Sequence, residues 1–194
     1  GKKIIIRCDL NVPIENGVIT DDTRIIASLR TIKYALRFNT KIILLSHLGK
    51  IKTEEDKKKN SLYPVVERLR EYLNTEVLFS PDTCSDRLTD MVNNMKWKSV
   101  LLIENTRFED VPNKRESECN DDLAKYWASL GDIFINDAYG TCHRNHTSIT
   151  GIPKYLPSGV GFLVEKELQK IDSVLDAKTH PFIAVLGGKK VDDK

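Results

Sequence analysis

The feature that most constrains the fold of this chain is a regular alternation of short apolar runs with longer amphipathic stretches. The short runs are rich in β-branched residues and continuously apolar, which is typical of strands buried on both faces of a sheet. They cover residues 3–8, 41–46, 76–79, 99–103, 132–136 and 181–186. Between them, apolar residues recur at helical spacing. These stretches cover residues 24–38, 61–73, 86–95, 121–130 and 163–175.

This repetition predicts an α/β fold. We expect a doubly wound, Rossmann-like parallel sheet of about six strands, flanked by helices on both faces and joined by right-handed crossovers. Ser61 and Asn120 are predicted helix N-caps, and Gly131 is a predicted helix stop. The charged run 52–60 and the polar stretch 109–120 are predicted to be loops. A chain of 194 residues suffices for one such domain.

Two of the expected helices carry clear apolar faces that should point into the core. For residues 24–38 the face consists of Ile25, Ile26, Leu29, Ile32 and Leu36. For residues 163–175 it consists of Leu163, Leu168, Ile171 and Leu175. Residues 187–194, a Gly-Gly turn followed by lysines and aspartates, follow the last apolar run. We therefore expect a domain over residues 1–186, and a junction that is cut short after it.

Composition excludes several classes of protein. The chain has 30 Lys and Arg against 28 Asp and Glu, a net charge of +2, so no global basic field predicts nucleic-acid binding. No apolar run approaches the ~20 residues needed to span a bilayer, and no signal peptide opens the chain. It begins at Gly1 without a methionine, which suggests a trimmed N-terminus. We expect a cytoplasmic protein that binds neither nucleic acid nor membrane.

The cysteines predict neither a disulfide framework nor a metal site. The four cysteines include no C-x-x-C pair, which favours reduced thiols. The nearest metal candidate is Cys142 with His143 and His146. Tetrahedral zinc needs converging ligands, and an arginine and an asparagine separate the two histidines. We expect no metal here.

Polar side chains follow four of the predicted strands, at the edge where ligands bind in open parallel sheets. Five of these side chains are cationic or imidazole groups: Arg24, His47, Lys50, Arg107 and Arg144. Asp9 and Asn11 follow the first strand and could bind hydroxyl groups. Arginine matches phosphate or carboxylate oxygens with a planar fork. Because the overall charge is nearly balanced, this convergence predicts a local site for a small, multiply charged anion.

Each of these residues also has a structural explanation when taken alone. A lone arginine at a strand end is commonly a surface ion-pair residue, and Asp9 could cap a turn. Asp137 is more readily a loop hydrogen-bond acceptor than a catalytic base. Other familiar sites are not indicated. Residues 159–161 lack the third glycine of a dinucleotide fingerprint, residues 187–190 lack the Walker A spacing, and no serine lies in a G-x-S-x-G elbow.

Six ordered segments resemble motifs of the phosphoglycerate kinase family. They are RCDLNVP (7–13), DTRI (22–25), SHLG (46–49), ENTRF (104–108), NDAYGTCHRNH (136–146) and LGGKKVDDK (186–194). The resemblance spans the chain but corresponds only to the N-terminal half of the family's sequence. The short 109–120 stretch is similar to bacterial members. Lys50 stands where the family usually has arginine, which keeps the charge but loses the bidentate fork. Lys189 stands where alanine is common.

The resemblance implies a glycolytic phosphotransferase with two domains. The family transfers a phosphoryl group between 1,3-bisphosphoglycerate and ADP, giving 3-phosphoglycerate and ATP. Its N-terminal domain holds the phosphoglycerate, and its C-terminal domain holds the Mg-nucleotide (Mg-ATP or Mg-ADP). The resemblance therefore implies that this chain holds phosphoglycerate, with no cofactor of its own. It would be a monomer whose partner is the missing C-terminal domain of the same chain.

The resemblance also implies roles for individual residues. Asp9 and Asn11 would contact the hydroxyl end of the substrate, and Arg24 would contact its carboxyl end and stabilise the phosphoryl group in flight. Lys190 and Lys194 would reach the transferred and nucleotide phosphates. The non-transferred phosphate would be surrounded by His47, Lys50, Arg107 and Arg144.

Half an active site cannot hold both reactants together, so this chain alone should lack turnover. Two alternatives remain: a stand-alone anion-binding module without catalysis, and an inactive scaffold that has lost the site. The retained Arg24, Arg107 and Arg144 disfavour the scaffold. A stop inside the last motif disfavours the stand-alone module.

Overall fold

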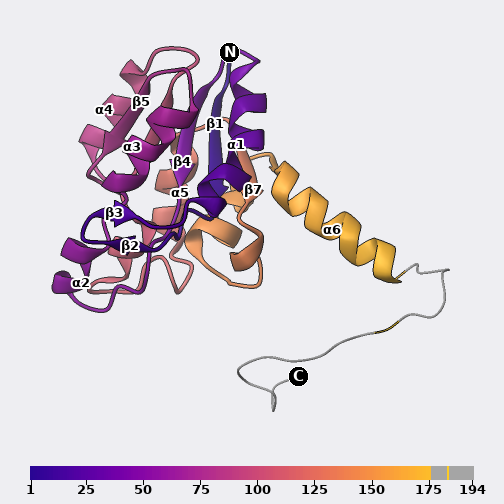
Figure 1. Cartoon of the computed structure of the whole chain (residues 1–194). Helices are drawn as coiled ribbons and strands as arrows, with labels where there is room; N and C mark the ends of the chain where they lie inside the picture. Colours follow the sequence, from indigo (N-terminus) through magenta and orange to yellow (C-terminus); the bar gives the residue numbers. More distant parts are fainter. Residues whose placement is uncertain (176–182, 184–194) are drawn as a thin grey trace.

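One parallel sheet organises the computed structural model, which describes residues 1–175 and residue 183 (Figure 1). Within this part of the chain six strands pair in the order β5-β6-β4-β1-β7-β8. Every pairing in the sheet is parallel. The strands are β1 (Lys3–Cys8), β4 (Lys41–Leu45), β5 (Val77–Ser80), β6 (Val100–Ile103), β7 (Ile133–Asp137) and β8 (Ser158–Val160). The prediction of an α/β fold with a six-stranded parallel sheet is confirmed.

Helices cover both faces of the sheet. The covering helices are α1 (Thr23–Leu36) and α3 (Tyr63–Tyr72) on one face and α4 (Asp86–Asn94) and α5 (Asp121–Ser129) on the other. Two further helices, α2 (Glu54–Lys59) and α6 (Phe162–Leu175), lie outside these layers. Successive strand residues point to opposite faces, so Ile6 packs with the cluster that includes α1 and α3, whereas Ile5 packs with α4 and α5. Two buried apolar layers therefore hold the sheet rigid beneath its loops. None of the described helices is long and apolar enough to cross a membrane.

Five of the six predicted strands are present within a residue or so of their expected ends. The sixth predicted strand, 181–186, lies outside the described residues, as do the expected boundary after residue 186 and the lysines at 190 and 194. The sixth strand of the sheet is instead β8, which pairs with β7 from Phe134↔Ser158 to Asn136↔Val160. Three exposed residues, one of them a glycine, carry no apolar pattern that could have predicted it.

Two segments predicted as loops have more structure than expected. The charged run contains α2, which begins with a capping box between Thr53 and Asp56 and has no buried residue. The polar stretch begins within η1 (Thr106–Asp110), a 3-10 helix, and folds back so that Glu116 is fully buried. A short hairpin of β2 (Ile14–Glu15) and β3 (Val18–Ile19) was also not predicted.

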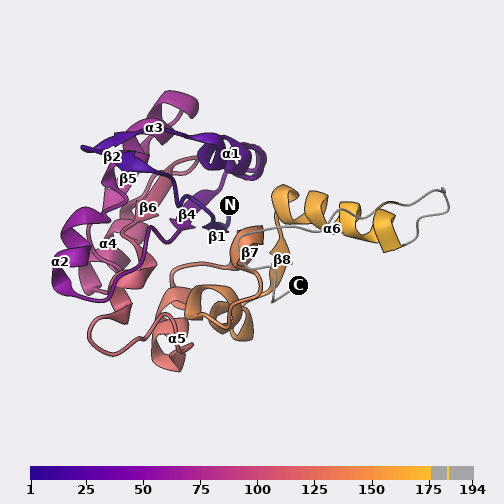
Figure 2. The same cartoon turned by 60° about the horizontal axis from the view of Figure 1, so that its bottom comes forward.

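The predicted helix ends and faces are only partly right. Asn120 caps α5 by accepting a hydrogen bond from the Leu123 amide, as expected. Ser61, however, is not the N-cap of α3, because that helix begins one residue later with Leu62 in the cap position. In α1, Ile26 was expected to point into the core, but its side chain is 48% exposed. Helix α6 extends away from the sheet in both views (Figure 2), which leaves Leu168 and Ile171 45% and 43% exposed.

Candidate functional site

The segments that follow β1, β4 and β7 leave the sheet side by side at its carboxyl edge. Arg7, the penultimate residue of β1, is paired in register with Leu45 of β4 and Asn136 of β7. The strand order also reverses here, since β4 and β7 lie on opposite sides of β1. A reversal of strand order opens a crevice above the strand ends in α/β sheets. The fold therefore supports the expected position of the site.

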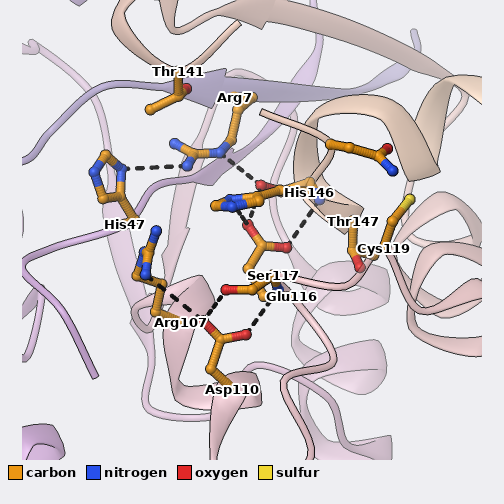
Figure 3. Close-up of polar contacts among 12 residues, drawn as sticks. Arg7, His47, Arg107, Asp110, Glu116, Ser117, Cys119, Thr141, His146 and Thr147 are labelled. Carbon is orange, nitrogen blue, oxygen red and sulfur yellow. Dashed lines mark hydrogen bonds and ion pairs between the residues drawn. The ribbon is translucent and has the colours of Figure 1, made fainter. Parts of the chain in front are cut away.

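Arg7 lies at the base of this site and is only 1% exposed. Its Nε donates a hydrogen bond of 2.8 Å to Ser148 Oγ, and its Nη1 donates to the Cys8 carbonyl. Its Nη2 lies 3.3 Å from His47 Nδ1 (Figure 3). Burial lowers the pKa of Arg7, and the nearby Glu116 and Asp9 carboxylates oppose this effect. All three guanidinium nitrogens thus have protein partners, which fixes the direction of the side chain.

Two imidazoles face this positive charge. Burial, followed by the charges of Arg7, Arg107 and Arg144, lowers the pKa of His47 to about 2. Burial, followed by the charges of Arg107 and Arg144, lowers the pKa of His146 to about 4. Both rings are therefore neutral at physiological pH, and each can donate one hydrogen bond and accept another. The same three arginines, Arg7, Arg107 and Arg144, affect both rings, which indicates that residues from four separate segments lie close together.

Asn105 holds the loops after β4 and β6 against each other and is fully buried. Its Oδ1 accepts hydrogen bonds from the amides of Leu48 (3.2 Å) and Arg107 (3.1 Å). Its Nδ2 donates to the carbonyls of Leu48 and Asn60. Arg107 is thereby placed at the rim, with Nη1 3.8 Å from Asp110 Oδ2 and a buried Nε that has no hydrogen-bond partner among the described residues. This guanidinium retains donors for a ligand.

The residues expected at the hydroxyl and carboxyl end of the substrate form a second group. Asp9 Oδ2 pairs with Arg24 Nη1 at 2.5 Å, although Arg24 is about half-exposed. Asn11 Oδ1 accepts a hydrogen bond of 2.8 Å from the Gly49 amide. Gly49 adopts φ +61°, and a Cβ there would meet Asn60 Oδ1 at 2.3 Å, so only glycine fits. The loops after β1 and β4 are thus joined at this point.

The other predicted site residues differ in how firmly they are placed. Arg144 is exposed, but its charge acts on His47 and His146. Lys50 is exposed, and no hydrogen bond or ion pair is found for it within residues 1–175. Lys190 and Lys194 lie outside the described residues. The structure therefore brings most, but not all, of the predicted set together.

Sequence reasoning missed three residues of this network. Arg7 and His146 were visible within motifs, and a charged residue in the apolar run 3–8 was the available signal for Arg7. Glu116 lies in a polar stretch and carried no signal. Asp137 behaves as the loop acceptor that we favoured, because its Oδ1 accepts from the Leu163 amide at 2.8 Å. Among the described residues, no group of three or more His, Cys, Asp or Glu side chains is arranged to hold a metal ion.

The arrangement is suited to binding an anion rather than to acid–base chemistry. Arg107 and Arg144 offer charge at the rim, while the neutral rings of His47 and His146 add directional hydrogen bonds. Hydrogen bonds to charged groups contribute about 1.5–3 kcal/mol each, so a few of them suffice for measurable affinity. A phosphate group with several oxygens would satisfy such a set of donors.

Comparisons with known proteins lead to one family. The family model described as "Phosphoglycerate kinase" matches residues 1–194. A phosphoglycerate kinase of Enterococcus faecalis is 54% identical over 194 residues, which are 100% of this chain and 49% of that protein. One of Listeria innocua is also 54% identical, with the same coverage. The chain thus spans about half the length of the curated relatives it matches.

Solved structures lead to the same family. The phosphoglycerate kinase of Coxiella burnetii has a TM-score of 0.82 and 36% identity, covering 99% of this chain and 47% of that one. The enzyme of Pyrococcus horikoshii has a TM-score of 0.83 and 32% identity over the same shares. The sequence motifs, the parallel sheet and the match over the whole chain therefore agree, and this chain belongs to the phosphoglycerate kinase family.

Proposed function

We propose that this chain binds the phosphoglycerate substrate of a phosphoglycerate kinase. In the complete protein, the reaction would be phosphoryl transfer between 1,3-bisphosphoglycerate and ADP, giving 3-phosphoglycerate and ATP in glycolysis. The observation that carries the proposal is that Arg7, His47 and Arg107 lie together at the carboxyl edge of the sheet (Figure 3), with Arg7 Nη2 3.3 Å from His47 Nδ1. A phosphorylated carboxylic acid has charge at both ends, which fits a site with two groups of polar residues.

The first group would hold the phosphate that is not transferred. Arg107 has a buried nitrogen without a hydrogen-bond partner in the described part of the chain, and Arg144 is exposed, so both can turn donors toward a ligand. His47 would add a hydrogen bond from a ring that Arg7 orients. Lys50 would contribute charge from the rim. Its compact ammonium group would contact the phosphate less directionally than arginine would.

The second group would hold the other end of the substrate. Asp9 and Asn11 would bind the hydroxyl, and Arg24 would bind the carboxyl and stabilise charge on the phosphoryl group in flight. The ion pair of Arg24 with Asp9 supports this role, because it holds the guanidinium over the same loop. Phosphoryl transfer depends on such positioning and charge stabilisation, with little acid–base work.

We propose that the nucleotide binds mainly outside this chain. Mg-ATP or Mg-ADP would be held mainly by the C-terminal half that the relatives have beyond this chain. Lys190 and Lys194 would contact the transferred and nucleotide phosphates from the junction after residue 186. We further propose that the 194-residue chain is a cytoplasmic monomer that binds phosphoglycerate weakly and shows no turnover.

A titration of 3-phosphoglycerate, followed by two-dimensional amide NMR, tests the substrate site. Saturable shifts should cluster in the loops after β1, β4, β6 and β7. Arg107→Met should abolish them, whereas Arg87→Met should not, because Arg87 lies on α4 and is 67% exposed. Equal affinity for inorganic phosphate would indicate a general anion site instead. A dispersed spectrum without shifts at millimolar ligand would refute binding by this chain.

A further inference from the structure

Glu116 is the least expected charged residue of the molecule. It lies in a polar stretch that predicts a solvated loop, yet its side chain is fully buried. A buried carboxylate is costly unless it is paired and hydrogen-bonded. Its partners are the Ser148 amide, at 3.0 Å from Oε2, and the Ser148 hydroxyl, at 2.5 Å from Oε1. Burial raises the pKa of Glu116, and the charge of Arg7 opposes that effect.

The Ser148 hydroxyl connects Glu116 to the anion site. It donates to Glu116 and accepts the 2.8 Å hydrogen bond from Arg7 Nε. A hydroxyl has one proton, so donation to the carboxylate leaves its lone pairs for the guanidinium. Arg7 Nη2 in turn lies 3.3 Å from His47 Nδ1. An unbroken polar chain thus runs from the buried carboxylate to a ring at the proposed phosphate site.

Glu116 also holds the segment that carries His146. Its carbonyl accepts the Thr147 amide at 2.9 Å, and its Oε1 lies 3.9 Å from His146 Nδ1. The chain between His146 and Ser148 is therefore attached to Glu116 by its backbone and by its side chains. One residue fixes two neighbouring parts of the site, although it lies too deep to contact a ligand.

We propose that Glu116 is a positioning residue of the anion site, acting through Ser148 on Arg7 and hence on His47. The proposal rests on the proposed function of this site. The proposal is testable because the charge of Glu116 and its positioning role have opposite effects on anion binding. A negative charge near an anion site opposes anion binding, so charge alone predicts that Glu116→Gln strengthens binding. Positioning predicts that the same change weakens binding, because the Ser148 hydroxyl that holds Arg7 Nε loses its carboxylate acceptor.

Three variants separate these effects. Glu116→Gln removes the charge with little change of shape, and Ser148→Ala removes the link but keeps the carboxylate. Glu118→Gln is the matched control, since Glu118 lies two residues away on the surface and pairs with Lys114 at 3.4 Å. In a titration, Glu116→Gln and Ser148→Ala should each bind 3-phosphoglycerate about tenfold more weakly than the unchanged chain does. Glu118→Gln should stay within about twofold.

The double variant adds a further criterion. If Glu116 acts through Ser148, the combined change should weaken binding no more than the stronger single change. Binding by Glu116→Gln that equals or exceeds that of the unchanged chain would overturn the proposal. So would losses that simply add in the double variant.

A measurement without ligand keeps this inference separate from the proposed function. The Arg7 Nε–H resonance should be well resolved and slow to exchange, because that proton is buried against Ser148. It should shift and exchange faster in Glu116→Gln and Ser148→Ala, and remain unchanged in Glu118→Gln. If Glu116→Gln fails to fold, Ser148→Ala alone decides. An unchanged Arg7 resonance there would refute the positioning role even if 3-phosphoglycerate binds.

Discussion

At the scale of single residues, the two buried imidazoles connect the site to pH. The pKa of His47 is lowered to about 2 and that of His146 to about 4, against an ordinary value of 6.5. Between these values the unfolded chain binds protons that the folded chain does not. The stability that these rings contribute is therefore complete above pH 6.5 and is lost as pH falls below it.

We expect the free energy of unfolding to fall between pH 6.5 and pH 5, by at most about 1.4 kcal/mol per pH unit for each imidazole. His47→Gln should flatten this dependence, because glutamine does not titrate. Urea unfolding at several pH values measures both slopes. His143→Gln is the control, since that ring is exposed, and its slope should match that of the unchanged chain. Equal slopes for all three proteins would contradict the prediction.

Arg24 should matter for the ligand and not for the fold. It is about half-exposed, and its ion pair with Asp9 is worth at most about 1 kcal/mol in such a position. A hydrogen bond to a charged ligand is worth more, about 1.5–3 kcal/mol. Arg24→Met should thus weaken 3-phosphoglycerate binding by at least about tenfold while the unfolding free energy hardly changes. Calorimetric titration and urea unfolding of the same sample decide, and a loss of stability without loss of binding would refute it.

At the scale of elements, the start of α6 depends on the close approach of two segments, the end of β7 and the residues that precede α6. Asp137 Oδ1 accepts the Leu163 amide, and a Cβ on Gly161 would lie 2.3 Å from that oxygen. Gly161→Ala should therefore destabilise the chain by about 1–3 kcal/mol. Gly159→Ala is the matched control in β8, where the nearest contact of a new Cβ would be an ordinary 3.7 Å. Urea unfolding compares them, and equal stability of the two variants would show that the Asp137 contact is not limiting.

The elements also show which parts of the fold were predictable. Buried strands and the helices packed on them carry their own apolar pattern, so β1 and α5 were found close to their actual bounds. Helix α2 has no such pattern. It depends on the Thr53 capping box and on surface pairs such as Lys57 with Glu54, which also occur in loops. Strand β8 depends on its neighbour β7 and not on its own residues.

The site was predictable to the extent that it lies at strand ends. The edge of a parallel sheet gathers such residues whatever their distance in sequence, which is why His47 and Arg107 could be expected together. Glu116 follows no strand directly. It reaches the site because its segment folds back against Ser148, a long-range contact that leaves no local pattern. The structure was needed to reveal it.

At the scale of the whole molecule, the proposed site is built from four separate segments, and all four must be in place for the proposed binding. They follow β1, β4, β6 and β7, which belong to one sheet, whereas α6 extends away from that sheet (Figure 1). A ligand that binds only this assembled edge stabilises the folded chain by mass action. At a concentration one hundred times its Kd, 3-phosphoglycerate should add about 2.7 kcal/mol to the free energy of unfolding.

Hydrogen exchange shows where that stabilisation acts. With 3-phosphoglycerate, the amides of residues 46–50, 105–110 and 140–148 should exchange more slowly, because the ligand joins those loops. The amides in the second half of α6 should not change, because α6 extends away from the sheet and its residues Ile171 and Val174 are exposed. Raised salt should reduce the protection, since charge attraction contributes to binding. Protection in the second half of α6 equal to that in the three loops would contradict an action through the strand-end loops.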